Sequence, residues 1–297
     1  MPPTACTISL PEGFRIGDVL AFHRRDAQTV AERVENDEIA KGLLWEGKPA
    51  CLRIALAPGA AQVTLDVEDG SADATAVERM ARRMLGLTQD VVRFERDFAD
   101  HPLIGAVIAR RSGLRVPATA TPFEAITWAI TGQQISVGAA TAIRRRLILA
   151  ADARHSGGLW CYPDAERIVR MTEDGLRPLG FSATKARTIH ALSAAVESGA
   201  LPLDAWAVAP DAEEIRARLR EVRGIGPWTV SYALLRGFGW LDGSLHGDVA
   251  VRRNLQVLLG RTEKLTEAET EAWLAPFSPW RAMIAAHLWM MQADDGY

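Results

Sequence analysis

A glycine-rich turn followed by an aspartate is the part of this sequence whose residue types and spacing point most directly to chemistry. The turn is Gly224-Ile225-Gly226-Pro227, and Asp248 follows it after about one helix and a loop. Glycine permits close approach of another backbone, and proline suits the first position of a new helix. The free N–H groups of a restarting helix form an anion site that fits one phosphate. A carboxylate held nearby could act on the molecule that carries the phosphate.

Two predicted helices meet at this turn, which makes it an αα-hairpin. Asp211 is expected to cap the first helix, and Pro227 begins the second. On the other side of the turn, the backbone carbonyls of Arg220, Val222 and Ile225 could hold a monovalent cation, Na+ or K+, that would help to neutralise the phosphate. Most turns of this kind only connect helices, so the residues around this one decide its interpretation.

The composition is that of an ordinary globular protein with room for about two domains. The chain has 297 residues, of which 48% are hydrophobic and 24% charged. Cys6, Cys51 and Cys161 are far apart, which excludes disulfide, zinc and iron–sulfur spacings and favours a reducing, cytoplasmic location. We expect no secretion signal and no membrane partner, because neither a basic start followed by an apolar run nor a spanning apolar stretch is present.

The charge of the chain limits how it could bind nucleic acid. The net charge is −3 and the pI is about 6.1, which argues against charge-driven coating of DNA. The charge does not exclude a protein that binds a few phosphates through backbone amides and local arginines. The run Arg144-Arg145-Arg146 is by itself expected on a solvated helix face.

The first part of the chain, residues 1–97, is predicted to be a small α+β domain with an antiparallel sheet. Residues 54–56 and 63–67 are predicted strands on either side of the turn Pro58-Gly59. The pattern T-x-x-E at Thr29 predicts a helix that ends near Asn36. Apolar residues at helical spacing predict another helix over residues 76–85.

From about residue 98 the pattern is helical throughout. Thr121-Pro122-Phe123-Glu124 combines a cap, a proline at the first helical position and a glutamate at the third, and therefore predicts a helix start. Further helices are predicted over residues 137–146, 164–171, 182–198, 249–259 and 279–291. We expect one helical part over residues 122–240 and a second over residues 98–121 and 241–297, with a cleft between them.

The combination of motifs resembles a known family. Leu219, the hairpin Val222-Arg-Gly-Ile-Gly-Pro-Trp-Thr229 and Gly247-Asp248 are similar to the signature of the helix-hairpin-helix DNA glycosylase superfamily. Within it, Ile130-Thr-Gly-Gln-Gln-Ile-Ser136 and Pro279-Trp-Arg with His287-Leu-Trp289 resemble the 3-methyladenine DNA glycosylase II group. The resemblance covers nearly the whole chain. It implies a mainly α protein, with an N-terminal α+β part ahead of a two-part, all-helical glycosylase core.

The resemblance implies that Asp248 is the catalytic residue. Cleavage of a glycosidic bond passes through an oxocarbenium-like transition state, which an ionised carboxylate beside the sugar stabilises, or for which it orients a water. On its own, Asp248 would be expected only to cap the helix that begins at Val249. The two roles can coexist.

The residue after the hairpin bears on whether the reaction is hydrolysis alone or includes a lyase step. Related bifunctional enzymes carry a lysine nucleophile at the second position after the second glycine, where this chain has Trp228. The resemblance therefore implies a monofunctional hydrolase without lyase activity and without an iron–sulfur cluster. It also assigns Trp228, Tyr232 and Trp289 to an aromatic base pocket, since aromatic faces attract a flat cationic base. Core packing is the alternative for each aromatic alone.

The resemblance also implies the DNA contacts. Gly224, Gly226 and Thr229 would hold a phosphate, and Gln134 or Ile135 would fill the gap left by the flipped base. The expected partner is double-stranded DNA with alkylated bases. We expect a cytoplasmic monomer, associated with the nucleoid if the host is bacterial.

The function predicted from the sequence is therefore a glycosylase for alkylated purines of the 3-methyladenine type. Two alternatives stay open. One is a glycosylase for another lesion, such as an oxidised or deaminated base. The other is a non-catalytic helix-hairpin-helix DNA-binding protein, which would have no use for the aspartate or for an aromatic cluster.

Overall fold

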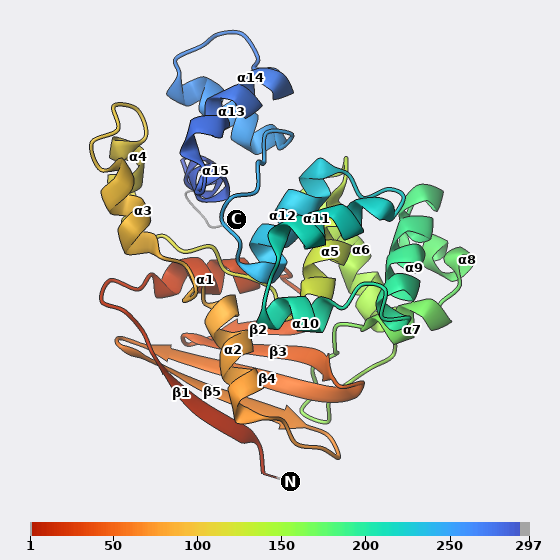
Figure 1. Cartoon of the computed structure of the whole chain (residues 1–297). Helices are drawn as coiled ribbons and strands as arrows, with labels where there is room; N and C mark the ends of the chain where they lie inside the picture. The colour runs from red at the N-terminus through yellow and green to blue at the C-terminus, as the bar shows by residue number, and fades with distance from the viewer. Residues whose placement is uncertain (1, 292–297) are drawn as a thin grey trace.

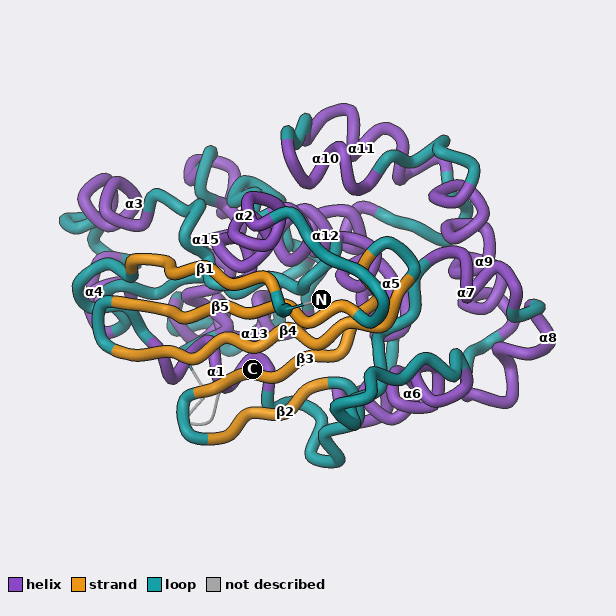
Figure 2. The backbone as a smooth tube through the Cα atoms, turned by 90° about the horizontal axis from the view of Figure 1, so that it is seen from below, coloured by secondary structure: helices purple, strands orange, loops and turns teal. Residues whose placement is uncertain are grey.

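The computed structural model describes residues 2–291, with a sheet at one end of the molecule and helices stacked above it (Figure 1). Every neighbouring pair of strands in the sheet is antiparallel, and the spatial order is β1-β5-β4-β3-β2. Figure 2 views the same sheet from below, with the helices behind it. The strands are β1 (Thr4–Ser9), β2 (Glu32–Glu35), β3 (Glu38–Trp45), β4 (Lys48–Ala57) and β5 (Ala60–Val67).

Helices make up most of the remaining chain, which confirms the predicted class of a mainly α protein with an N-terminal α+β part. Those before the glycine-rich hairpin are α1 (Ile16–His23), α2 (Ala74–Met84), α3 (Val91–Phe98), α4 (Gly105–Arg110), α5 (Pro122–Gly132), α6 (Val137–Ala150), α7 (Ala165–Arg170), α8 (Glu173–Leu176), η1 (Arg177–Leu179), α9 (Ala183–Glu197), α10 (Leu203–Val208) and α11 (Ala212–Glu221). Those after it are α12 (Pro227–Phe238), α13 (Val249–Leu258), α14 (Glu267–Leu274), η2 (Ala275–Phe277) and α15 (Arg281–Trp289).

One predicted helix is wrong. The T-x-x-E pattern at Thr29 does not start a helix: Thr29 has a φ of 49°, and Glu32 begins the strand β2. The reason lies in the next turn, where Asn36 and Asp37 both have positive φ, 48° and 60°. Two such residues form the tight turn that suits a β-hairpin, and they pair β2 with β3. The predicted hairpin around Pro58-Gly59 is confirmed as β4 and β5.

Two predicted helix starts, at Thr121 and at Asp211, are confirmed. Thr121 caps α5 by accepting from the backbone N–H of Glu124 at 3.2 Å, and Pro122 is the first helical residue. Asp211 caps α11 by accepting from two backbone amides, each at 3.0 Å. The side chain of Glu124 is not part of the cap, however, because it is drawn into a buried cluster of charges.

Three large hydrophobic clusters lie in the described part of the chain. The first joins the sheet to α1 and α2, through residues such as Leu52 and Met80. The second is formed by helices between residues 123 and 238. The third joins α3 and α4 to the helices after residue 240 and to α12. Within residues 2–291, no helix has the length and apolar content needed to cross a lipid bilayer.

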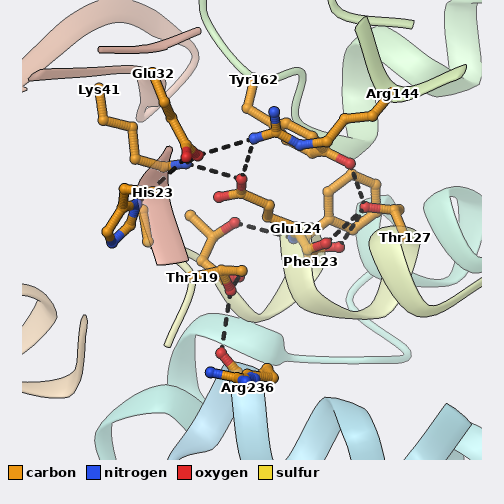
Figure 3. Close-up of polar contacts among 12 residues, drawn as sticks. His23, Glu32, Lys41, Thr119, Phe123, Glu124, Thr127, Arg144, Tyr162 and Arg236 are labelled. Atoms are coloured by element: carbon orange, nitrogen blue, oxygen red, sulfur yellow. Dashed lines mark hydrogen bonds and ion pairs between the residues drawn. The ribbon is translucent and has the colours of Figure 1, made fainter. Parts of the chain in front are cut away.

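A cluster of buried charges ties the sheet to the helices (Figure 3). Lys41 of β3 forms ion pairs with Glu32 of β2 and, at 2.8 Å, with Glu124 of α5. Arg144 of α6 reaches the same two carboxylates at 2.9 and 2.7 Å. The Nδ1 atom of His23, in α1, lies 3.3 Å from Oε2 of Glu32. The four charges balance, which is the condition under which ion pairs persist inside a protein.

This cluster corrects the expectation that Arg144 lies on a solvated helix face, since its side chain is buried and paired. Burial opposes ionisation of Glu32, but the charges of Lys41 and Arg144 outweigh that effect. They hold the pKa of the Glu32 carboxyl well below its usual range. The stabilisation from this ionised carboxylate is present above the unfolded pKa of about 4.3, and is lost as the pH falls toward the lower folded value.

The burial of His287 predicts that the protein also loses stability at mildly acidic pH, above the range in which Glu32 takes up its proton. His287 of α15 stacks on Phe94 at 5.4 Å, and burial, aided by the charges of Arg15 and Arg111, lowers its pKa to about 3. The folded protein therefore keeps His287 neutral below pH ~6.5, where the unfolded chain gains a proton. We expect the free energy of unfolding to fall by up to about 1.4 kcal/mol for each pH unit below 6.5.

Urea unfolding of the wild type and of His287→Phe between pH ~6.5 and ~5 measures this effect. The phenylalanine variant should lose the slope that His287 contributes, because its ring packs on Phe94 without titrating. His190→Gln, at a half-exposed position on α9, should keep the wild-type slope. An unchanged slope in His287→Phe would contradict the assignment.

Candidate active site

The hairpin has the geometry of an open helix start. α11 ends at Glu221, the N–H of Ile225 donates to the carbonyl of Val222 at 3.0 Å, and Gly226 is the N-cap of α12. No side chain caps α12, so its first amides are open to an anion. Gly224 has a φ of +98°, whereas Gly226 has a φ of −94°, so only the first glycine requires the left-handed region.

The two glycines predict different outcomes when each is replaced by alanine. A Cβ on Gly224 would lie 2.0 Å from the hydroxyl of Thr188, whereas one on Gly226 would meet nothing within 4 Å. Gly224→Ala should therefore cost about 1–3 kcal/mol of stability and weaken DNA binding. Gly226→Ala should keep the stability, because the added methyl group would meet no other atom, and it should weaken only DNA binding if the phosphate expected from the sequence binds at the start of α12. Thermal unfolding and duplex titration distinguish the two outcomes, and equal losses of stability would contradict this account.

The turn between α5 and α6 lies directly against the hairpin. The side chain amide of Gln133 donates to the carbonyl of Gly224 at 3.1 Å and to the hydroxyl of Thr229 at 3.0 Å. Lys185 of α9 donates to the carbonyl of Gln133 at 2.7 Å. Two sets of predicted DNA-binding residues, more than 80 residues apart in sequence, are thereby placed side by side.

Within this turn, the residues differ in exposure. Gln134 has a φ of 57° and is exposed, and Ile135 is 37% exposed. Both side chains are therefore accessible at the surface. Thr229, in contrast, is buried, and its hydroxyl faces Gln133. Gln133 was not singled out from the sequence, although it stands next to Gln134.

Asp248 is the N-cap of α13, and its carboxylate is held by four donors. Oδ1 accepts from the backbone amides of Ala250 at 2.9 Å and Val251 at 3.0 Å, and from the indole N–H of Trp289 at 3.0 Å. Oδ2 accepts from the indole N–H of Trp228 at 3.1 Å. All four partners are N–H donors, so the carboxylate acts at each only as an acceptor.

The predicted aromatic residues gather around this carboxylate. Trp228 and Tyr232 lie one turn apart on α12, with ring centroids 5.3 Å apart, and Trp289 ends α15. Trp228 and Trp289 are half-buried, and Tyr232 is buried. The four side chains therefore form one cluster, in which the tryptophans act through their N–H groups as well as through their ring faces.

A small cavity with about 30 Å³ of accessible space, enough for a water molecule, continues from Tyr232 toward the N-terminal domain. It is also lined by Phe22 and Arg25, at and just after the end of α1, and by Trp128 of α5. The guanidinium carbon of Arg25 lies 4.1 Å from the centre of the Phe22 ring and 5.8 Å from that of Trp128. Sequence reasoning missed these residues, because nothing local links α1 to a hairpin some 200 residues later. For Trp128 a signal existed, since it is a large aromatic four residues before Gly132.

Two segments of the chain match known protein families. Residues 7–121 match the AlkA N-terminal domain, and residues 127–279 match the HhH-GPD superfamily base excision DNA repair protein model. A Bacillus subtilis protein named DNA-3-methyladenine glycosylase is 24% identical over 293 residues, which is 95% of each chain. Escherichia coli DNA-3-methyladenine glycosylase 2 is 30% identical over 189 residues, which is 63% of each chain.

The fold is also shared with a solved structure, the 3-methyladenine DNA glycosylase from Archaeoglobus fulgidus. The TM-score is 0.81 at 20% identity, over 96% of this chain and 97% of that one. The family model that contains the hairpin covers just over half of this chain, and the match to the N-terminal model precedes it. This protein is therefore a DNA glycosylase that belongs to the HhH-GPD superfamily of base excision DNA repair proteins and carries an AlkA N-terminal domain.

Proposed function

We propose that this glycosylase is monofunctional and hydrolyses the N-glycosidic bond of alkylated purines, of the 3-methyladenine type, in double-stranded DNA. The reaction would leave an abasic site for base-excision repair. The observation that carries the proposal is the Asp248 carboxylate, which two indole N–H groups and the start of α13 fix in place. The names of the relatives from Bacillus subtilis and Escherichia coli support the lesion class.

The two oxygens of Asp248 are not equivalent. Oδ1 accepts three hydrogen bonds, which exceeds its two lone-pair positions, whereas Oδ2 accepts one. Oδ2 is therefore the oxygen with capacity left for the reaction. As the bond between base and sugar breaks, positive charge develops on the deoxyribose, and the fixed carboxylate stabilises it without reorganisation. The cationic alkylpurine takes the bonding electrons and leaves as the neutral base. Water then adds to the anomeric carbon and loses one proton to the solvent.

The aromatic side chains supply the base pocket in this proposal. A base must leave the duplex before Asp248 can reach its glycosidic bond, which costs a few kcal/mol of stacking and pairing. Stacking against Trp228, Tyr232 or Trp289 offsets part of that cost. Alkylation at N3 or N7 makes a purine electron-poor, and each aromatic face attracts such a cation by about 0.5–2 kcal/mol.

The positions of the lysines favour hydrolysis over lyase chemistry. The chain has four: Lys41, Lys48, Lys185 and Lys264. Lys41 lies in the buried charge cluster, and Lys48 and Lys185 donate to backbone carbonyls away from Asp248. Lys264 is exposed between α13 and α14. A Schiff-base mechanism needs a free amine beside the sugar, and the lysine position of the bifunctional enzymes holds Trp228.

The DNA contacts follow from the neighbouring hairpin and turn. In the proposal, the open amides at the start of α12 hold a phosphate, and a monovalent cation bound by the carbonyls of Arg220, Val222 and Ile225 would help to neutralise it. Gln134 or Ile135 fills the space of the flipped base. Gln133 joins the hairpin to the turn between α5 and α6, so that the amides that bind the phosphate and the side chain that enters the duplex keep a fixed distance from each other.

Duplexes that each carry one lesion test the proposal. Released bases are quantified for 7-methylguanine, 3-methyladenine, 8-oxoguanine and uracil, and strand breaks are measured before and after alkali. We expect methylated purines to be released, strand breaks only after alkali, and no covalent complex after borohydride reduction. Breaks before alkali would contradict the hydrolase assignment, release of only 8-oxoguanine or uracil would contradict the lesion class, and binding without release would favour a non-catalytic protein.

A further inference from the structure

We propose that Arg236 is a positioning residue of the active site, which holds the Trp289 ring where its indole N–H reaches the Asp248 carboxylate. The inference rests on the proposed function for its effect on the rate of base release. Trp289 is the last residue of α15 and is half-buried, so its own helix restrains its ring less than a ring inside the core. The groups packed against the ring therefore decide where its N–H points.

Arg236 belongs to the same helix face as two of the aromatic residues at the site. Trp228, Tyr232 and Arg236 follow one another at intervals of four residues along α12, so they share one face. At the start of this face, Trp228 donates directly to Oδ2 of Asp248 at 3.1 Å. At its end, the guanidinium carbon of Arg236 lies 5.7 Å from the centre of the Trp289 ring, and that ring donates to Oδ1 at 3.0 Å. One face of α12 thus acts on both carboxylate oxygens, on one directly and on the other through Trp289.

Groups from outside α12 fix the guanidinium of Arg236. It donates to the carbonyl of Pro117 at 2.7 Å, and its carbon lies 4.7 Å from the centre of the Phe22 ring of α1. The backbone N–H of Thr119 donates to the carbonyl of Arg236 at 2.9 Å, and the hydroxyl of Thr119 lies 3.2 Å from the same carbonyl (Figure 3). The N-terminal domain and the segment that follows it therefore hold this arginine in one place.

Burial strengthens the contact between this charge and the Trp289 ring. Arg236 is 1% exposed, so water screens little of the attraction between its charge and the indole face. That attraction restrains the ring, and a restrained ring keeps its N–H directed at Oδ1 of Asp248. Without the charge, the ring would enter other rotamers, and the carboxylate would lose one of its four donors for part of the time.

Arg236→Met removes the charge and keeps a long apolar side chain, and Arg83→Met is the matched control. Arg83 is also buried and donates to a carbonyl of the same segment, that of Ala120, at 2.6 Å, but within residues 2–291 it lies over no aromatic ring. Single-turnover release of 7-methylguanine should be about three- to tenfold slower in Arg236→Met and within about twofold of wild type in Arg83→Met. Both should bind a duplex that contains a tetrahydrofuran abasic analogue with wild-type affinity, because the proposed phosphate site lies at the start of α12.

A double-variant cycle with Trp289→Phe separates positioning from a structural role. Phenylalanine has no N–H to direct, so Arg236→Met should slow the Trp289→Phe variant no further. Losses of rate that multiply in the double variant would overturn the inference, as would an equal loss of rate in Arg83→Met.

Hydrogen exchange of the Trp289 indole N–H tests the same contact without any activity. Its NMR signal is the one that Trp289→Phe lacks. Exchange with deuterium should be about threefold or more faster in Arg236→Met, while the Trp228 indole N–H keeps its wild-type rate. Unchanged exchange at Trp289, or equal acceleration at both indoles, would overturn the inference.

Arg236→Lys provides the test if Arg236→Met does not fold. Lysine keeps a positive charge near the Trp289 ring but lacks the planar fork of arginine. The exchange rate of the Trp289 indole should stay near that of wild type, and faster exchange in the folded lysine variant would contradict a role for the charge. If the wild type released no base, the proposed function would fail, whereas the exchange rates would still support or overturn the assignment of Arg236.

Discussion

Replacing Asp248 by asparagine should lower the single-turnover rate of base release by roughly a thousandfold or more and leave DNA affinity nearly unchanged. Asparagine keeps a side-chain oxygen and is an equally good N-cap, so α13 should stay intact. It carries no charge to stabilise the oxocarbenium-like transition state. Its amide nitrogen is also a donor, so the indole N–H of Trp228 or Trp289 would lose its acceptor.

Asp211→Asn is the matched control for this prediction. Asp211 also caps a helix by accepting from two backbone amides, but it is exposed and has no indole partner. It should keep the wild-type rate, affinity and thermal stability. Release of 7-methylguanine by Asp248→Asn at the wild-type rate would overturn the catalytic assignment, whereas joint loss of rate and folding would indicate that capping is the dominant role.

Replacing Glu124 by alanine should destabilise the protein by about 3–5 kcal/mol at neutral pH. The variant would leave Lys41 and Arg144 with Glu32 as their shared partner, so one buried positive charge would be uncompensated. Water cannot solvate that charge well, because Lys41 is fully buried and Arg144 nearly so. The midpoint and slope of urea unfolding measure the loss.

Two further variants show whether charge balance is the cause. Glu38→Ala breaks the exposed pair with Arg53, 3.0 Å long, and should cost less than about 1 kcal/mol. The double variant Glu124→Gln with Lys41→Met removes one charge of each sign and should recover much of the loss. If Glu124→Ala cost as little as Glu38→Ala, the cluster would not be what holds the sheet domain to the helices.

Local signals in the sequence predicted the helical elements well. The caps at Thr121 and Asp211 and the break after Gly132 depend on residues within one turn of each other, so the sequence pattern contains the relevant interactions. The same kind of signal failed at Thr29, where a chance T-x-x-E pattern was outweighed by the turn at Asn36-Asp37 and by pairing with β3. Strand pairing depends on a partner that a local pattern does not contain.

The candidate site was only partly predicted from the sequence, because some of its features are local and others depend on residues far apart in the chain. The sequence by itself determined the hairpin, with its open helix start, and the capping position of Asp248, because backbone hydrogen bonding over a few residues fixes both. Only the tertiary structure decided that two indole N–H groups, 20 and 41 residues away along the chain, hold the Asp248 carboxylate. It also placed Arg25 beside the Phe22 ring and buried Arg144, because these positions follow from how helices pack on the sheet, which no spacing within one helix encodes.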